Sequence, residues 1–461
     1  MPLGQTRTVV APVQADAAQL FTRLARRPIG TLTTLFAVCV ITFLLTIPLP
    51  RVDNLLIGSD GVLYYLYARS LVIDGDLDFR NEYVHFYGAG HVPADTPAGR
   101  PPNKMSIGLG LVWIPFFLAA HALSVLLGLP TDGYSYVYQA AVCLGSMAYG
   151  FIGLLLTYRL CREYADAVSA LVSVVLLWFA GNVVYYMVVE PSMSHMASLG
   201  AVSALLAWWR LDPQRTTLRH WFVCGALGGL AALIRAQDGL LLVLPAVQWI
   251  TEAVTLTRGA EWRAFRVHVA AGAAMALAAA LVFAIQLWAW FVVFGSIAHS
   301  GYFYRGRDGF DWWHPHIVQT LFSPFHGLFA WHPMYLVGAV GLWWVGRVDR
   351  RYAWLLALGC ALQVYVVAAW TVWWQGDAFG GRMLISCVPL FAVGLAQVVD
   401  RLRRMTWWAV IGPGALLVLW NAAFMVQYHL RFIPIGHAIT FQQLVWDKLT
   451  LPLALWHRFG R

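Results

Sequence analysis

Long runs of predominantly apolar residues recur along the whole 461-residue chain, and short polar segments separate them. A helix needs about 20 such residues to cross a hydrocarbon core of roughly 30 Å. The pattern predicts an all-α polytopic membrane protein: a bundle of about eleven transmembrane helices with juxtamembrane helices on its outer face. The predicted spans are 29–49, 136–158, 167–188, 192–209, 221–235, 238–255, 268–294, 332–346, 352–373, 383–398 and 407–428.

The composition strengthens this prediction. Hydrophobic residues make up 60% of the chain and charged residues only 11%, whereas a typical soluble domain has about 25% charged residues. The apolar run at 29–49 follows Arg23, Arg26 and Arg27 and is too long for the core of a cleavable signal peptide. We therefore expect it to be a retained membrane anchor.

The distribution of positive charge sets the expected topology. The net charge of +9 would suggest a nucleic-acid partner in a soluble protein. Here, however, 18 of the 31 Lys and Arg residues lie in segment 1–28 and in five short loops between spans. Such loops face the cytoplasm. We therefore expect a cytoplasmic tail at 1–28, a membrane module at 29–428, an outer tail at 429–461 and no nucleic-acid partner.

One further apolar run, 106–127, tests this topology. If it crossed the membrane, the basic loop "RLCRE" would face outward, because the loop 50–105 must already face outward after the first span. The run also contains Gly108, Gly110 and Pro115, which weaken a straight helix. We expect it to lie at the outer face or dip into it, with clean spanning as the alternative.

Neither the cysteines nor the histidines indicate a metal site. The six cysteines lie in or beside apolar runs and have no metal-ligand spacing. His314, His316, His326 and His332 cluster in sequence, but their spacings do not match a helical metal pair with a carboxylate. We expect no cofactor and no metal, although a divalent ion stays open as the less favoured alternative.

The predicted first outer loop, 50–105, contains an unusually acidic stretch. Residues 60–73 mix apolar side chains with three tyrosines, which predicts a helix lying in the membrane interface with its tyrosines at the water boundary. Asp60, at the start of this helix, is either an N-terminal cap or a general base at the lip of an apolar cavity. The following "DGDLDF", 74–79, is more typical of a turn than of a metal site.

These segments resemble the GT-C superfamily of membrane glycosyltransferases. An Asp after the first span, an aromatic helix with "ARSL" and then "DGDLDF" resemble the first outer loop of the bacterial branch related to protein O-mannosyltransferases and lipid A aminoarabinose transferases. "PPNKMSIGLGLVWIPFF", "YYMVVEPSMSH", "LIRAQDGLLLVLPAV", "FSPFHGLFAWHPMYL" and "WWQGDAFGGRMLISCVPLFAVGL" continue the likeness over most of 30–400. The superfamily's usual acidic pair is replaced here by Asp60-Gly61.

The resemblance implies an inverting, metal-independent glycosyltransferase with a polyprenyl-phosphate sugar as donor. The acceptor would be a hydroxyl of a lipid, glycan or protein. In such an enzyme Asp60 would be the general base, and Lys104 and Arg382 would hold the donor phosphate. The resemblance also implies a bacterial inner membrane location with the active site on the periplasmic side. The aromatic residues at 312–313 and 373–374 would border the groove for the lipid tail.

Further polar residues on the predicted outer face are candidates for substrate binding. They are Glu190, His195, Arg235, Trp374, Gln375 and Asp377. Each also has a structural interpretation: Arg235 would pair with Asp238, Asp377 would pair with Arg382, and His195 would be a satisfied interfacial histidine. Lys104 would in the same way only extend its ammonium group to the interface.

A transporter or lipid-carrier flippase with an outward-facing cavity is the alternative function. Such a protein needs broken helices that meet near the middle of the membrane, and charged residues along a path through it. The unusual polar residues gather instead on one predicted face, which favours the enzyme.

Overall fold

The computed structural model describes residues 19–49, 55–304, 306 and 308–460, so parts of the predicted tail 1–28 and loop 50–105 fall outside the described residues. Every regular element in these ranges is a helix, which confirms the predicted all-α class. Among the described residues, eight helices are long and apolar enough to cross a membrane by length and composition. They are α2 (Pro28–Thr46), α5 (Gly108–Leu127), α6 (Tyr136–Arg162), η3 with α11 (Ala236–Arg258), α12 (Trp262–Phe294), α16 (Arg350–Ala369), η4 with α17 (Arg382–Met405) and α18 (Trp408–His429).

Three shorter apolar helices accompany these eight: α7 (Ala167–Phe179), α10 (Leu218–Ile234) and α15 (Met334–Val348). Each predicted span overlaps a described helix, with ends that differ by several residues, but the count of eleven crossings stays a prediction. The span predicted at 167–188 is interrupted, since α7 ends at Phe179 and α8 (Val183–Val188) follows. Asn421 of α18 donates hydrogen bonds to the carbonyls of Phe179 (2.9 Å) and Gly181 (2.7 Å), which satisfies the end of α7.

The run 106–127 is an uninterrupted 20-residue helix, α5, with Pro115 inside it. Its glycines permit close packing: a Cβ on Gly108 would lie 2.2 Å from the carbonyl oxygen of Leu233, and one on Gly110 would lie 2.6 Å from Cβ of Tyr67. The helix is therefore continuous in spite of the three residues that were expected to weaken it. Whether α5 crosses the membrane stays a prediction.

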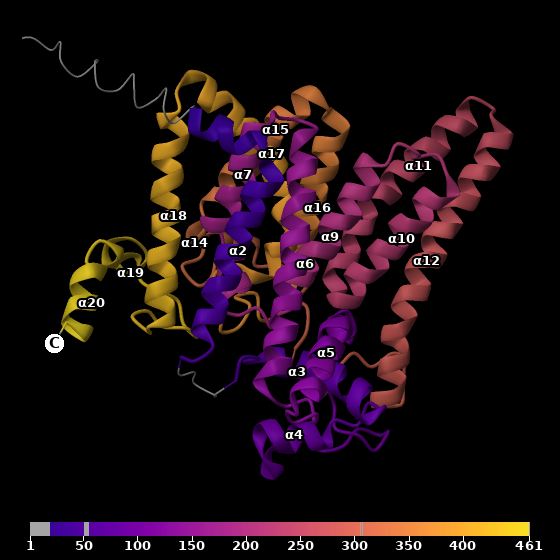
Figure 1. Cartoon of the computed structure of the whole chain (residues 1–461). Helices are drawn as coiled ribbons and strands as arrows, with labels where there is room; N and C mark the ends of the chain where they lie inside the picture. The colour runs from indigo at the N-terminus through magenta and orange to yellow at the C-terminus, as the bar shows by residue number, and fades with distance from the viewer. Residues whose placement is uncertain (1–18, 50–54, 305, 307, 461) are drawn as a thin grey trace, which may run out of the picture. The chain divides into compact units, whose positions relative to one another are not determined.

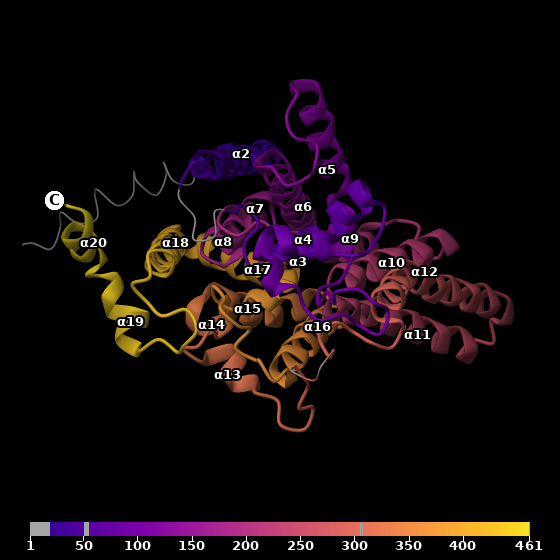
Figure 2. The same ribbon diagram turned by 90° about the horizontal axis from the view of Figure 1, so that it is seen from below.

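The described chain forms two compact units. The first comprises Met1–Cys39, Leu154–Tyr185 and Trp312–Arg461, and the second comprises Val40–Gly153 and Tyr186–Asp311. In the first unit, α17 (Val388–Met405) packs between α7 and α15, as the end-on view in Figure 2 shows. Glycines permit the close α15–α17 contact, because a Cβ on Gly394 would lie 2.1 Å from the carbonyl oxygen of Gly338.

In the second unit, α10 packs along α12, and α11 (Val243–Arg258) lies beside them (Figure 1). Glycine again sets the distance, since a Cβ on Gly225 would lie 2.0 Å from the carbonyl oxygen of Met275. α9 (His195–Leu211) and the 3-10 helix η3 (Ala236–Leu242) pack on α10. Small residues thus replace large side chains where helix backbones meet, as in other membrane bundles.

Short polar residues begin several of these helices. The side chains of Asp166, Thr217 and Asp349 accept hydrogen bonds from the backbone N–H groups three residues later, at the starts of α7, α10 and α16. Each cap satisfies one of the N–H groups that an α-helix leaves unpaired at its start. All three caps lie within or next to basic loops that the sequence predicts to be cytoplasmic.

The outer-loop helix is buried within its unit, contrary to the expectation of tyrosines at a water boundary. It consists of α3 (Asp60–Arg69) and a π-helical turn, η1 (Ser70–Asp74). Tyr64, Tyr65 and Tyr67 are at most 5% exposed. Their hydroxyl groups donate to Ser194 Oγ (3.2 Å) and to the carbonyl oxygens of Gly133 and Met105. The tyrosines therefore serve as buried anchors. Two short helices, α4 (Arg80–Tyr87) and η2 (Ala89–His91), follow.

The predicted outer tail, 429–461, forms α19 (Phe441–Val445), η5 (Trp446–Lys448) and α20 (Leu451–Phe459). Lys448 is buried against α18: its Nζ lies 3.3 Å from the ring centroid of Phe424 and 4.4 Å from that of Trp420. This cation–π contact fixes the tail to the end of α18.

Candidate functional site

Asp60 and Lys104, both proposed from the sequence, form an ion pair. Asp60 is the first residue of α3, and Lys104 Nζ lies 3.1 Å from Asp60 Oδ1. The Asp60 side chain is 21% exposed and the Lys104 side chain 47% exposed, so both are within reach of a ligand. Ser59, at the N-cap, makes no side-chain capping bond. Asp60 therefore lies in the first turn of α3, where a negative charge is also stabilised by the helix dipole.

The backbone around Lys104 is anchored on the same helix. Asn103 Nδ2 donates to the carbonyl oxygen of Leu63 (2.8 Å), and the Tyr67 hydroxyl donates to that of Met105 (3.1 Å). On the other side, a Cβ on Gly301 would lie 2.3 Å from the carbonyl oxygen of Asn103 and 2.5 Å from Lys104 Cα. These contacts fix the base of the lysine and leave its ammonium end exposed. Asn103 was not a candidate from the sequence. The only signal in the sequence that could have indicated it is its position next to Lys104.

Gly61 has no space for a side chain. In the superfamily that the sequence resembles, this position usually carries a second carboxylate. A Cβ there would lie 2.4 Å from Ser192 Oγ and 3.2 Å from the carbonyl oxygen of Ser192. Asp60 is accordingly the sole carboxylate of the Asp60-Gly61 position. The same contact brings the segment after Glu190 against the start of α3, and Tyr64 binds Ser194 from α3. Glu190 is half-buried in this segment, and its backbone carbonyl accepts a hydrogen bond from Met193.

The other carboxylates of the acidic stretch hold the outer loop together. Arg69 Nη1 lies 2.6 Å from Asp74 Oδ2 and 2.7 Å from Glu82 Oε1, and the guanidinium stacks 4.0 Å from the ring centroid of Tyr134. Glu82 is fully buried, and this burial raises its pKa to about 7 although Arg69 opposes the shift. The sequence analysis did not identify this cluster, because the sequence of the loop does not indicate which of its charged residues are buried.

The predicted turn "DGDLDF" is confirmed. Asp76 Oδ1 accepts hydrogen bonds from Ser70 Oγ (2.9 Å) and from the backbone N–H of Asp78 (3.0 Å). Gly75 takes the left-handed conformation, with φ of 77°. Both features end the helical segment in an Asx-type turn.

His195 and Arg235 meet in the second unit. Arg235 Nη1 donates to His195 Nδ1 (2.8 Å), and Arg235 Nη2 donates to Gln237 Oε1 (3.3 Å). Because arginine can only donate, His195 Nδ1 accepts and the proton of a neutral ring lies on Nε2. The Asp238 carboxylate instead accepts from Ser198. The structural interpretation in which Arg235 pairs with Asp238 is therefore wrong for the side chains.

In the first unit, Gln375 supports the loop that ends at Arg382. Gln375 is fully buried, has a φ of 69° and accepts a hydrogen bond from the backbone N–H of Met383 through Oε1 (2.7 Å). A left-handed backbone is costly for a residue other than glycine, so the surrounding contacts must hold it. Gln375 therefore has a supporting position, and it fixes the start of the 3-10 helix η4 (Arg382–Cys387).

Trp374 stacks on Phe325, with ring centroids 5.7 Å apart. Its carbonyl oxygen accepts a hydrogen bond from His326 Nδ1 (2.8 Å), and burial lowers the pKa of His326 to about 4. Asp377 is exposed at the tip of the loop, and a Cβ on Gly436 would lie 3.0 Å from its Oδ1. The loop and the C-terminal tail thus lie at the same end of the first unit. Arg382 is half-buried beside Gly376.

The candidate residues fall into separate groups. Asp60, Lys104, Glu190, His195 and Arg235 belong to the second unit, whereas Trp374, Gln375, Asp377 and Arg382 belong to the first. Among the described residues, no group of three or more His, Cys, Asp and Glu side chains is arranged to hold a metal ion.

The fold is similar to that of a solved membrane protein. ArnT from Cupriavidus metallidurans, in a crystal structure bound to undecaprenyl phosphate, matches 92% of this chain and 72% of its own, with a TM-score of 0.53 and 16% sequence identity. This match shows that the chain shares the overall helical fold of that protein, in agreement with the predicted fold class. No protein-family model matches the chain, and no curated protein matches it by sequence.

Proposed function

We propose that the protein is a membrane glycosyltransferase that moves a sugar from a polyprenyl-phosphate donor to an acceptor hydroxyl. The observation that carries this proposal is the partly exposed Asp60–Lys104 pair at the start of α3, in a fold shared with a protein that binds undecaprenyl phosphate. Acidic and cationic groups side by side suit a reaction in which a proton is removed and a phosphate departs.

In the proposed reaction Asp60 takes the proton of the acceptor hydroxyl. The acceptor oxygen then attacks the anomeric carbon, the bond between that carbon and the phosphate oxygen breaks, and the polyprenyl phosphate leaves with the bonding electron pair. A single displacement of this kind inverts the configuration at the anomeric carbon. Lys104 stabilises the negative charge that develops on the leaving phosphate.

The ion pair with Asp60 gives Lys104 a second role in the proposed reaction. A pair between partly exposed charges contributes only about 0–1 kcal/mol, so a phosphate can draw Lys104 away at little cost. Asp60 Oδ1 would then exchange its contact with the ammonium group for one with the acceptor hydroxyl, whose proton it takes. Donor binding and activation of the base would then be coupled through a single lysine.

Arg382 is the proposed second phosphate ligand. Its guanidinium can meet two phosphate oxygens with parallel N–H bonds, whereas a lysine acts as a point charge. The buried Gln375 supports this position, since it holds the backbone of the residue after Arg382. Trp374 and the exposed Asp377 would contact the sugar or the acceptor from the same loop.

Glu190, His195 and Arg235 are proposed to line the acceptor side. The hydrogen bond from Arg235 fixes the orientation of the His195 ring, and the segment after Glu190 packs on the start of α3. We further propose that the protein lies in the bacterial inner membrane with this site facing the periplasm, as the positions of the basic loops favour.

The decisive experiment is product analysis. Purified protein is incubated with a set of polyprenyl-phosphate sugars and with lipid, glycan and peptide acceptors, and the products are identified by mass spectrometry. We expect a glycoside to form together with free polyprenyl phosphate. Asp60→Asn keeps the shape of the side chain and removes its basicity, and should slow transfer by about 10²–10⁴-fold.

A flippase would translocate the lipid without forming a glycoside, so transport without product would reject the enzyme. Wild-type transfer by the Asp60→Asn variant would leave the enzyme in place but remove Asp60 as its base.

A further inference from the structure

The α15–α16 hairpin has a repeated arrangement of arginine and tryptophan. The two helices are joined by Asp349 alone, and Arg347 and Arg350 flank this turn. Trp343 lies four residues before Arg347, and Trp354 lies four residues after Arg350. Four residues are about one helical turn, or roughly 5.4 Å along the axis. Each helix therefore presents an arginine near the turn and a tryptophan one turn further along.

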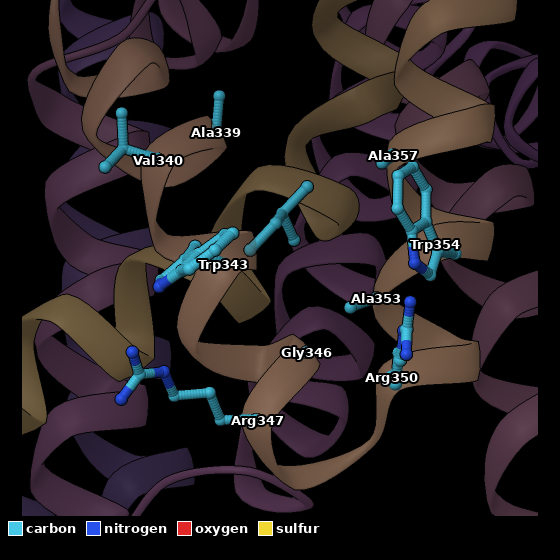
Figure 3. A pocket seen from close by; sticks show the side chains of 10 residues that line it. Ala339, Val340, Trp343, Gly346, Arg347, Arg350, Ala353, Trp354 and Ala357 are labelled. Atoms are coloured by element: carbon cyan, nitrogen blue, oxygen red, sulfur yellow. The ribbon is translucent and has the colours of Figure 1, made fainter.

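A groove of 570 Å³ opens between these four side chains. Figure 3 shows Trp343 and Trp354 on opposite sides of it and both arginines at the end near the connecting turn. The groove exists because the residues between them are small: Ala339, Gly346, Ala353 and Ala357.

The groove is open and positively charged at one end. Trp343 is 69% exposed and Trp354 is 67% exposed. Arg347 lies 5.9 Å from the ring centroid of Trp343, and no carboxylate of the described residues pairs with Arg347 or Arg350. The nearby Asp349 is engaged by the backbone N–H of Tyr352 (2.9 Å) and the hydroxyl of Tyr164 (3.2 Å).

We propose that this groove binds one anionic phospholipid. Its phosphate would lie between Arg347 and Arg350, and an acyl chain would run over the small residues between the two tryptophans. Arginine fits phosphate oxygens well, and tryptophan is enriched at the level of lipid headgroups, beside the end of a membrane helix. Net negative charge matters because two arginines without carboxylate partners attract an anionic lipid more than a zwitterionic one.

This site is independent of the proposed glycosyltransferase reaction, since it uses none of the residues assigned to that reaction. It requires only that the α15–α16 turn lies at a membrane surface. The lipid would stabilise a hairpin whose outer face is otherwise left with two exposed tryptophans.

The test is site-resolved photo-crosslinking. Purified full-length protein in detergent is titrated with a diazirine-labelled phosphatidylglycerol, irradiated and digested, and adducts on peptides from 334–369 are quantified by mass spectrometry. Saturable labelling is expected, with the matching phosphatidylcholine probe labelling these peptides far less. In Arg347→Gln/Arg350→Gln the half-saturating concentration should rise by roughly 30-fold.

Two further variants distinguish lipid binding in the groove from general attraction to positive charge. Ala357→Phe fills the groove while both arginines remain, so labelling should fall although the charge is unchanged. Arg263→Gln/Arg266→Gln removes two exposed arginines near the exposed Trp262 at the start of α12, and should leave labelling of 334–369 unchanged. Equal labelling by the two probes, or equal loss in the α12 control, would overturn the proposal. So would wild-type labelling of both groove variants.

Discussion

Gly61 lies so close to Ser192 that a Cβ on Gly61 would fall 2.4 Å from the serine hydroxyl oxygen. This contact joins the start of α3, which carries Asp60, to the segment after Glu190. It also explains in physical terms why a single carboxylate occupies this position, since the backbone approach needs the space that a second aspartate would fill.

Gly61→Ala should therefore destabilise the protein, although alanine is ordinarily the better helix former. Overpacking of this kind costs typically about 1–3 kcal/mol, and thermal unfolding in detergent should show a lower Tm. Gly58→Ala is the matched control, because nothing lies within 4 Å of a Cβ there. Ser192→Gly should restore much of the loss in the double variant. A Gly61→Ala protein as stable as wild type would contradict the close contact.

Lys104→Ala and Arg382→Ala should each weaken donor binding and slow transfer while leaving the fold intact. Loss of one charged contact to the leaving phosphate costs about 2–4 kcal/mol, or some thirty- to thousand-fold in kcat/KM. Donor affinity and turnover are measured on monodisperse protein. Arg80→Ala is the control, since Arg80 forms an exposed pair with Asp95 in the same outer loop. Unchanged affinity and turnover would mean that the two residues only anchor their segments at the interface.

Glu82 should make stability depend on pH. Burial raises its pKa from the ordinary 4.5 to about 7, so the folded state favours the protonated carboxyl. The stability that this group contributes is complete below about pH 4.5 and is lost as the pH rises through about 7. Glu82→Gln imitates the protonated form. We expect the Tm of wild type to fall relative to that of Glu82→Gln between pH 5 and 8, and parallel profiles would refute this.

The helix α5 is predicted not to cross the membrane. Single cysteines replacing Thr131 and Glu163, both exposed, are treated in intact cells with a membrane-impermeant maleimide. Cysteine at 131 should be labelled from outside, and cysteine at 163 should react only after the membrane is opened. His91→Cys, in the predicted outer loop, is the positive control. External labelling at 163 would show that α5 crosses.

The sequence alone determined the class of the fold. Apolar runs of membrane-spanning length are a local property, and each predicted span overlaps a described helix. The order of short motifs also led to the GT-C likeness, and Asp60 and Lys104 emerged as candidates because charged residues beside apolar runs are rare. These inferences need no knowledge of which segments meet.

Only the tertiary structure decided which residues touch. In this structure Lys104 pairs with Asp60, and Asp74 and Glu82 bind Arg69. The tyrosines of α3, which were expected at the membrane interface, are buried. The structure also shows that Gly108 and Gly110 serve helix packing. Such outcomes depend on side chains from distant segments competing for the same space and the same hydrogen bonds. Hydropathy and spacing along the chain carry no information about that competition. The sequence therefore indicated the candidate residues, and only the packing determined their partners.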